Sequence, residues 1–241
     1  MPMTAIKTGR LYGLGMGPGD PELVTLKAVR LLRAAAVIAY PAPEQGDSFA
    51  RRIAAEWLDQ GQDEIAIRFP MRPGPPPAAI YGEAAARLAA VLDRGDDIAF
   101  LCQGDPLFYG SFAGIMTRLV PRYSVTVVPG VSSLTACAAA AGMPLVQRDA
   151  ALAVIPATLE EAALTRQLAE AECAAVIKLG RHFAKLRRVA DRLGLLDSAV
   201  YIEHASLPDQ RIMPLAEVDP DASPGGVPYF AMALLRRDAP R

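Results

Sequence analysis

The first residues that suggest chemistry are the glycines of the segment LYGLGMGPGDPELVT, residues 11–25. Glycine-rich turns between a strand and a helix commonly hold phosphate, either with the spacing G-x-G-x-x-G or with Gly-Lys-Ser/Thr at the end. Counting from Gly13, the third glycine position holds Pro18; counting from Gly15, it holds Asp20. The helix dipole would attract a phosphate to this position, but the carboxylate of Asp20 takes that place and repels phosphate. We predict a loop shaped for close backbone approach to a ligand but poorly suited to phosphate.

A second candidate turn is Gly104-Asp105-Pro106, which follows an apolar, strand-like run. Gly104 lets the backbone come close to a ligand, and the Asp105 carboxylate accepts charge-assisted hydrogen bonds from NH or OH groups. The alternative is an ordinary tight turn capped by the aspartate. Ser132 and Ser133 precede an alanine-rich segment, where a plain helix N-cap is likewise an alternative to ligand binding.

Several classes of site and protein are disfavoured. The net charge of -1 over 241 residues argues against a nucleic-acid binder. The three cysteines and two histidines form no cluster with metal-ligand spacing, so no metal site is expected. The apolar run at 134–145 is too short to span a bilayer. Scattered cysteines without a leader are typical of a reducing cytosol, so we predict a soluble cytoplasmic protein.

These motifs must be positioned by elements that alternate along the first half. Strands are predicted at 11–14, 35–41, 64–69, 97–102 and 124–130. One helix is predicted to begin at a cap formed by Asp20, and three more lie at 48–58, 80–92 and 112–119. Residues 71–80 are predicted to form a proline-rich loop. Such alternation predicts a parallel sheet with right-handed crossovers. Ligands bind beyond the carboxyl ends of parallel strands, where both glycine-rich turns fall.

The second half predicts strands near 152–155, 174–178, 199–202 and 229–235, with helices near 160–170 and 183–193. We therefore expect two α/β domains, 1–128 and 129–241. The first should hold a mostly parallel sheet and the second a mixed sheet, with the active-site cleft between the domains.

Four motifs in fixed order carry a resemblance to a known family: GLGMGPGDPELVTLKAVRLL at 13–32, CQGDPLFYGS at 102–111, VVPGVSSLTACAAAAGMPL at 127–145 and YIEHASLPDQ at 201–210. Together they resemble the S-adenosylmethionine-dependent tetrapyrrole (corrin/porphyrin) methyltransferases over nearly the whole chain. The resemblance implies a homodimer whose domains clamp a tetrapyrrole, with the first domain forming the tetrapyrrole trough. The donor, S-adenosylmethionine, carries no phosphate, which agrees with the glycine spacing.

The resemblance also implies which residues contact the donor, with the second domain completing the site: Pro18, Gln103, Gly104, Asp105, Phe108, Ser132, Ser133, Leu179 and Ala205. Gln103 departs from the family pattern, in which an acidic or small residue often precedes Gly-Asp-Pro.

Methyl transfer from a sulfonium to carbon is an in-line displacement, in which proximity and alignment supply most of the rate. It needs no metal. A base could remove the proton from the methylated carbon, and Asp20, Tyr40 and Glu203 are candidates between which the sequence does not choose. The acceptor carries carboxylates, for which the candidate partners are five arginines: Arg51, Arg52, Arg68, Arg72 and Arg118.

Within the family, the segments 39–58, 100–112 and 144–159 look most like the precorrin-2 C20-methyltransferases of cobalamin synthesis, whose product is precorrin-3A. Three alternatives stay open: methylation of a related tetrapyrrole (cobalt-factor II at C20, uroporphyrinogen-III or precorrin-3), a non-catalytic nucleotide-binding module, and an NAD-dependent oxidoreductase. The missing G-x-G-x-x-G spacing argues against the last.

Overall fold

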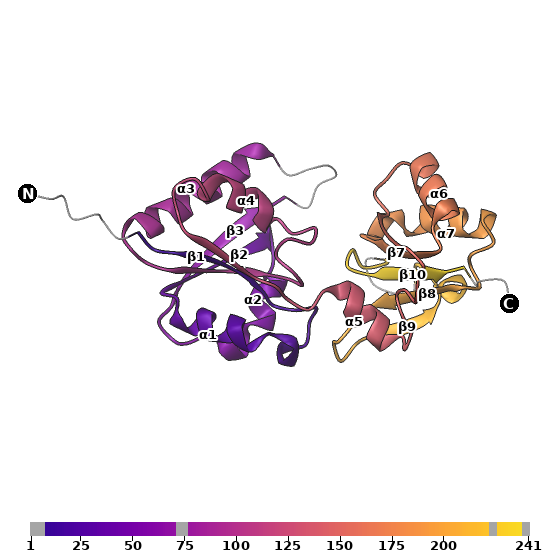
Figure 1. Ribbon diagram of the computed structural model, residues 1–241, viewed down its shortest axis with the longest axis horizontal. Coiled ribbons are helices and arrows are strands. Elements are labelled where there is room, and N and C mark those ends of the chain that lie inside the picture. The colour runs from indigo at the N-terminus through magenta and orange to yellow at the C-terminus, as the bar shows by residue number, and fades with distance from the viewer. Residues whose placement is uncertain (1–7, 71–76, 222–225, 238–241) are drawn as a thin grey trace, which may run out of the picture. The chain divides into compact units, whose positions relative to one another are not determined.

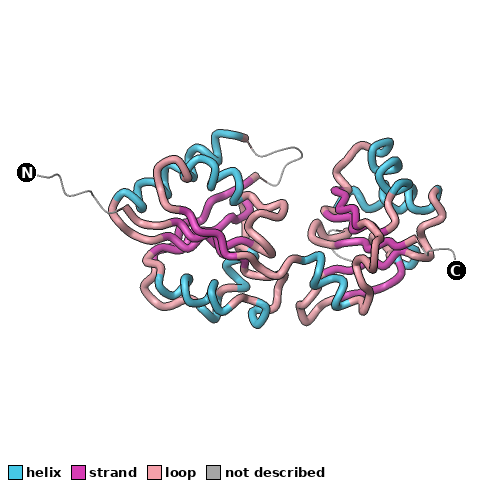
Figure 2. Tube along the Cα trace, viewed as in Figure 1, coloured by secondary structure: helices cyan, strands magenta, loops and turns pink. Residues whose placement is uncertain are grey.

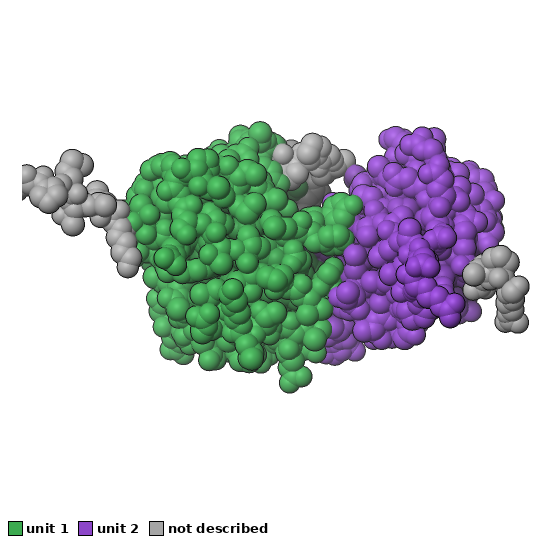
Figure 3. Space-filling model, in the orientation of Figure 1, with its two compact units in different colours: residues 1–132 green, residues 133–241 purple. Residues whose placement is uncertain are grey.

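The structure, a computed structural model, describes residues 8–70, 77–221 and 226–237. The chain forms two compact units, residues 1–132 and 133–241 (Figure 3). Each unit contains one five-stranded sheet, the first parallel and the second mixed. This confirms the predicted fold class of two α/β domains. Within the described ranges, no helix has the length and apolarity needed to cross a membrane.

The first sheet has the strand order β3-β2-β4-β1-β5, and every pairing in it is parallel. Its strands are β1 (Leu11–Gly15), β2 (Val37–Pro43), β3 (Asp63–Phe69), β4 (Ile98–Cys102) and β5 (Val125–Val128). The central strand β4 is buried at all five positions, which explains its unbroken apolar sequence: both faces of a parallel sheet are covered.

Four helices cover the two faces of this sheet (Figure 1): α1 (Leu26–Ala34), α2 (Phe49–Ile53), α3 (Ala78–Asp93) and α4 (Phe112–Leu119). Helices α1 and α2 pack on one face, in a core that includes Ile38 and Leu101. Helices α3 and α4 pack on the other, in a core that includes Phe100 and Phe112, whose ring centroids are 5.2 Å apart. Alternate residues of the strands thus point into two separate cores.

The second sheet has the order β6-β7-β10-β8-β9, and only β6 and β7 pair in parallel. Its strands are β6 (Leu152–Pro156), β7 (Cys173–Ile177), β8 (Ala199–Glu203), β9 (Arg211–Pro214) and β10 (Met232–Arg236). The helices of this unit are α5 (Ser133–Ala140), α6 (Glu161–Glu170) and α7 (Phe183–Arg192). A core that includes Leu164, Phe183 and Tyr201 joins α6 and α7 to the strands.

Two predicted helices are wrong in extent. Asp20 caps only the short 3-10 helix η1 (Pro21–Leu23); Val24 is then extended, and α1 starts after Thr25, whose hydroxyl accepts from Ala28 N at 3.2 Å. The helix predicted at 48–58 ends at Ile53 and continues as the 3-10 helix η2 (Ala55–Trp57).

Two further differences concern the loops and strand edges. Most of the predicted proline-rich loop, residues 71–76, lies outside the described residues, and its last three positions already belong to α3. Strand β9 was not predicted, because it has only four residues and ends in proline. Strand β10 begins at Met232, three residues later than predicted, because Ala231 N bonds to Pro228 O in a turn.

Candidate functional site

The first candidate site is the edge of the parallel sheet where the strands end, which we call the carboxyl edge. Strands β1 and β4 are neighbours, but the chain leaves β1 toward α1 and leaves β4 toward α4, on opposite faces of the sheet (Figures 1 and 2). Such a point, where crossovers diverge, is the usual ligand-binding position of an open parallel sheet. The loops there are residues 16–20 after β1, 103–111 after β4 and 129–132 after β5.

The loops after β1 and β4 are joined backbone to backbone. Met16 N donates to Cys102 O at 2.8 Å, and Gly104 N donates to Gly17 O at 2.7 Å, which forms an isolated bridge. Gly104 has a φ of 65°, a left-handed conformation that costs glycine little and other residues about 1 kcal/mol or more. The turn after β4 is therefore fixed to the loop after β1 by main-chain contacts.

Glycines also let the loop after β5 reach this junction. A Cβ added to Gly130 would lie 2.2 Å from Gly104 O, and one added to Gly15 would lie 2.4 Å from Gly130 N. Neither distance is sterically allowed for a real side chain. The glycines of the opening motif thus serve close approach between neighbouring loops, a role that sequence spacing alone did not reveal.

Asp105 links the same loops through its side chain. Its Oδ1 accepts from Leu107 N at 2.9 Å, and its Oδ2 accepts from Gly130 N at 3.2 Å. Asp105 therefore does cap its own turn, as the alternative interpretation predicted. Each carboxylate oxygen has a second lone pair, so both oxygens retain capacity to accept a bond from a ligand.

The structure places the other predicted donor residues of the first unit on these same loops. Pro18 is buried next to Gly17 of the bridge, and Gln103 is half-buried next to Gly104. Phe108 is half-buried, and its ring meets that of Tyr109 edge to face at 5.0 Å. Tyr109 has a φ of 54°, an unusual conformation that in proteins clusters at functional sites. Ser132 lies on the loop after β5.

Two of the three predicted donor residues of the second unit, Leu179 and Ala205, lie at one edge of its own sheet. Strands β7 and β8 both pair antiparallel with β10, so they end at the same edge. Leu179 and Ala205 come two residues after these strands, and both are buried. Three residues there have positive φ without being glycine: Lys178 at 60°, His204 at 51° and Ser206 at 69°. Ser133 is the first residue of α5.

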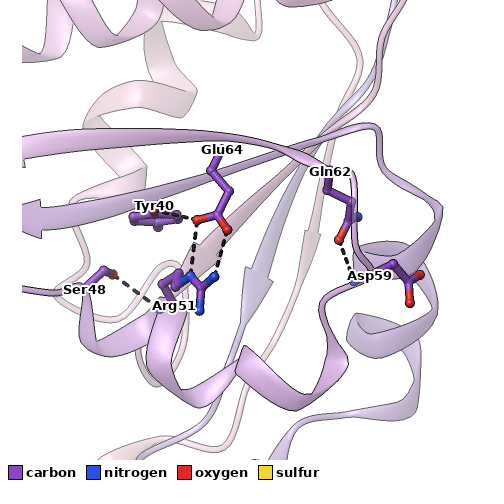
Figure 4. Close-up of polar contacts among 6 residues, drawn as sticks. All are labelled: Tyr40, Ser48, Arg51, Asp59, Gln62 and Glu64. Atoms are coloured by element: carbon purple, nitrogen blue, oxygen red, sulfur yellow. Dashed lines mark hydrogen bonds and ion pairs between the residues drawn. The ribbon is translucent and has the colours of Figure 1, made fainter.

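The candidate base Tyr40 does not lie at the carboxyl edge. It sits mid-strand in β2, opposite Ala66, and its hydroxyl donates to Glu64 Oε2 at 2.7 Å (Figure 4). Arg51 donates to both oxygens of Glu64, at 2.9 and 3.2 Å. Burial and then the hydrogen bond to Glu64 raise the pKa of Tyr40. A tyrosine that keeps its proton and already donates it to a carboxylate is poorly suited to act as a base.

The other two candidate bases differ in their surroundings. Glu203 is 4% exposed; it accepts a bond from the Tyr201 hydroxyl, and Arg211 Nη1 lies 2.8 Å from its Oε1. This carboxylate is committed to a buried network between β8 and β9. Asp20 lies on the loop after β1, and its Oδ1 accepts from Glu22 N at 2.9 Å. Of the three, Asp20 is the candidate on the carboxyl edge of the first sheet.

The candidate arginines also separate by their contacts. Arg51 pairs with Glu64, the guanidinium of Arg52 lies 4.7 Å from the ring centroid of Phe49, and Arg118 donates to Gly114 O at 2.6 Å. Arg68 donates to the carbonyl oxygens of Pro43, the last residue of β2, and of Gly46, in the segment that follows β2. Arg72 lies outside the described residues. Within the described ranges, no three His, Cys, Asp or Glu side chains gather closely enough to hold a metal ion.

The Glu64 pair predicts a small dependence of stability on acid. The hydrogen bonds from Arg51 lower the pKa of Glu64, so the pair stabilises the fold above the ordinary glutamate pKa, and this stabilisation is lost as the pH falls through the lowered value. Because both side chains are about a third exposed, we expect Glu64→Gln to cost only about 0.5–1 kcal/mol at pH 7 and nearly nothing in strong acid. Urea unfolding at several pH values measures this, with the exposed Glu83→Gln as control; equal curves for both variants would refute it.

Comparison with known proteins identifies the family of the chain. The model of a protein family described as Tetrapyrrole (Corrin/Porphyrin) Methylases matches residues 10–219. The chain belongs to this family. The family predicted from the four sequence motifs is thereby confirmed. In this tetrapyrrole methylase, the matched region includes all the loops of the carboxyl edge, both strands β7 and β8, and Leu179 and Ala205 that follow them.

Three similar proteins give the comparison more detail. The chain is 38% identical to the Precorrin-2 C(20)-methyltransferase of Sinorhizobium sp, over 97% of both chains. It is 44% identical to the Cobalamin biosynthesis protein CobIJ of Mycobacterium tuberculosis, over 94% of this chain but 46% of that protein, so it spans about half the length of that relative. Among solved structures, Uroporphyrin-III C-methyl transferase from Thermus thermophilus, complexed with S-adenyl homocysteine, has a TM-score of 0.69 and 27% identity, over 95% of this chain and 97% of that chain.

Proposed function

We propose that the protein transfers a methyl group from S-adenosylmethionine to C20 of precorrin-2, giving precorrin-3A in cobalamin biosynthesis. The observation that carries this proposal is similarity along 97% of both chains to a relative named for that reaction. Similarity of this extent leaves no large part of the fold unmatched. The remaining alternatives are a neighbouring tetrapyrrole and a cobalt-containing form of the same acceptor.

The chemistry of the carboxyl edge supports a cationic donor. Its three loops, residues 16–20, 103–111 and 129–132, contain no lysine or arginine, and their charged residues are Asp20 and Asp105. A sulfonium with an ammonium group is attracted by such a surface, whereas a pyrophosphate is repelled. The side chains present therefore fit S-adenosylmethionine better than a dinucleotide.

The protein's contribution to the reaction is mainly positional. The donor supplies an activated methyl group, and the displacement needs the sulfur, the methyl carbon and the acceptor carbon in line. The joined loops after β1, β4 and β5 hold donor contacts rigidly, because their backbones pack without intervening side chains. Asp20, on the same edge, is our candidate for receiving the proton that leaves the methylated carbon.

The decisive experiment is an assay with donor carrying a labelled methyl group. Purified protein should methylate precorrin-2, and NMR should place the label at C20, with cobalt-precorrin-2 tested in parallel. Calorimetry should show S-adenosylhomocysteine binding at low micromolar affinity, about -7 to -8 kcal/mol. A label at another ring carbon would reassign the acceptor, and NAD binding without donor binding would overturn the proposal.

Asp105 offers a test of the donor site itself. Asp105→Ala removes an acceptor beside the cationic donor and the bond to Gly130 N, so donor affinity should fall by roughly 1.5–3 kcal/mol. Asp105→Asn keeps an acceptor for Leu107 N and should lose about half as much. The control is Asp219→Ala, because Asp219 also accepts from a backbone N–H two residues on, at 3.0 Å. Donor titration of Asp105→Ala that matched this control would exclude Asp105 from the site.

We propose further that Ser133, Leu179 and Ala205 of the second unit complete the donor site, and that the protein is a cytoplasmic homodimer. Helix α5 supports the dimer, since half of its eight residues are alanine and Ala139 on it is exposed. Small side chains let another backbone approach closely at little cost in side-chain entropy. Light scattering at micromolar concentration measures the mass directly, and a mass of one chain would contradict the dimer.

A further inference from the structure

Among the described candidate arginines, Arg68 is the one that donates two hydrogen bonds to backbone carbonyl oxygens. Its Nη1 donates to Pro43 O at 2.8 Å and to Gly46 O at 3.1 Å. Both partners are neutral carbonyls, and among the described residues no carboxylate pairs with Arg68. The sequence at 71–76, which follows β3 closely, contains no Asp or Glu either. The side chain is thus held in place while its positive charge stays uncompensated by an ion pair.

The contacts of Arg68 leave one particular side of the guanidinium available. The two hydrogens of Nη1 are used by the two carbonyls, and no described residue accepts from Nε or Nη2. The Nε and Nη2 hydrogens form the fork that matches a carboxylate in two parallel hydrogen bonds. Because the side chain is exposed, a ligand can reach that fork. The geometry is that of an anion-binding group with its orientation already set.

The position of Arg68 relates it to the carboxyl edge. It lies one residue before the end of β3, opposite Ala42 of β2. Strand β3 is two strands from β4 and three from β1, so with neighbouring strands about 4.8 Å apart, Arg68 lies roughly 10–15 Å along the edge from the glycine junction. A tetrapyrrole is a wide macrocycle with carboxylates on flexible arms around its rim. Such a molecule is wide enough to reach from the glycine junction to Arg68. The donor can bind at the junction without reaching Arg68.

We infer that Arg68 binds a peripheral carboxylate of the tetrapyrrole acceptor, while the loops after β4, β1 and β5 hold the methyl donor. The inference rests on the proposed function for the identity of the acceptor. It divides the carboxyl edge between two ligands: the part with acidic side chains takes the cation, and the part with Arg68 takes the polyanion. Arg68 is then a residue that orients the acceptor and takes no part in bond making.

The test compares Arg68→Gln and Arg68→Lys with Arg87→Gln. Arg87 is a matched control, since it is exposed and its Nη1 also donates to a carbonyl of β3, that of Ala66, at 3.2 Å. Arg68→Gln should raise the KM for the acceptor about 10- to 100-fold, the loss expected for a hydrogen bond to a charged group, with kcat and donor Kd within twofold of wild type. The acceptor KM of Arg68→Lys should lie between those of the wild type and Arg68→Gln, because lysine keeps the charge but cannot donate two parallel hydrogen bonds. Arg87→Gln should leave all three quantities unchanged.

A role limited to holding the segment after β2 predicts a different pattern. Arg68→Gln would then lower the melting temperature and leave the acceptor KM equal to that of Arg87→Gln, which overturns the inference. The salt dependence gives a second readout: added salt should raise the KM of the wild type more than that of Arg68→Gln. If the wild type binds the tetrapyrrole but transfers no methyl, the proposed function fails, and absorbance titration of the same variants still decides the role of Arg68. A wild type that binds no tetrapyrrole overturns both.

Discussion

Gly130→Ala is expected to lower donor affinity at least 100-fold, about 2.7 kcal/mol or more. The new Cβ would lie 2.2 Å from Gly104 O and 2.8 Å from Gly15 Cα, and both are backbone atoms that cannot rotate away. The loop after β5 must therefore move from the loops after β1 and β4, which also breaks the bond between Gly130 N and Asp105. Calorimetric titration with S-adenosylhomocysteine measures the loss.

Two other glycines provide graded controls for this effect. Gly104→Ala meets no atom within 4 Å but forces alanine to a φ of 65°, so it should cost only about 1–2 kcal/mol of stability. Gly82 lies in α3 with open space around it, and Gly82→Ala should stabilise the protein by about 0.5–1 kcal/mol without touching donor binding. If Gly130→Ala bound donor as Gly82→Ala does, the three-loop junction would not belong to the donor site.

The first sheet was predictable because its strands are short apolar runs between turn residues. Strand β4 was found within one residue, since burial on both faces leaves no polar position to obscure it. The order β3-β2-β4-β1-β5 could not be obtained in this way, because the sequence of a strand does not state its neighbours. Helix ends were less accurate where local geometry decides, as at Val24, whose extended backbone separates η1 from α1.

The candidate site was predicted by residue type but not by contact. Asp105 was recognised as an acceptor, yet its bond to Gly130 N joins residues 25 positions apart, and no local pattern reveals such a pair. The unusual backbone conformations after β8, in the second sheet, could not be predicted for a related reason. His204 and Ser206 adopt positive φ without being glycine, so they give no composition signal. The two residues make contacts with Asp209 and Gln210, respectively, which directly precede strand β9. The sequence analysis did not predict that strand.

Arg211→Met is expected to destabilise the second unit by about 3 kcal/mol. Glu203 is 4% exposed, and Arg211 Nη1, 2.8 Å from its Oε1, is the cation that compensates this buried carboxylate. Removing one partner of a buried pair leaves an uncompensated charge, which typically costs 3–5 kcal/mol; the lower end applies because the Arg211 side chain is 41% exposed. Urea unfolding gives the total loss, and hydrogen exchange of the amides in β8 and β9 locates it.

The double variant Glu203→Gln with Arg211→Met separates the buried charge from the lost contact. A neutral glutamine still accepts from the Tyr201 hydroxyl, so more than half of the lost stability should return. The control is Arg236→Met, because Arg236 lies on a strand of the same sheet and donates to a neutral partner, Gln147 Oε1, at 3.0 Å. It should cost less than about 1 kcal/mol. Equal losses in Arg211→Met and Arg236→Met would show that the charge of Glu203 is not what Arg211 stabilises.

The pair of Glu203 and Arg211 also affects the predicted donor site, because it holds together the two ends of the loop 204–210. Glu203 and Arg211 are paired across β8 and β9, and between them the loop 204–210 carries Ala205, one of the predicted donor contacts. Within that loop His204 Nδ1 lies 2.6 Å from Asp209, and Ser206 N donates to Gln210 Oε1 at 2.8 Å. Since positive φ at His204 and Ser206 persists only where surrounding contacts enforce it, loosening the ends should let Ala205 move. Arg211→Met should therefore weaken donor binding at temperatures where the protein is still folded, whereas Arg236→Met should not.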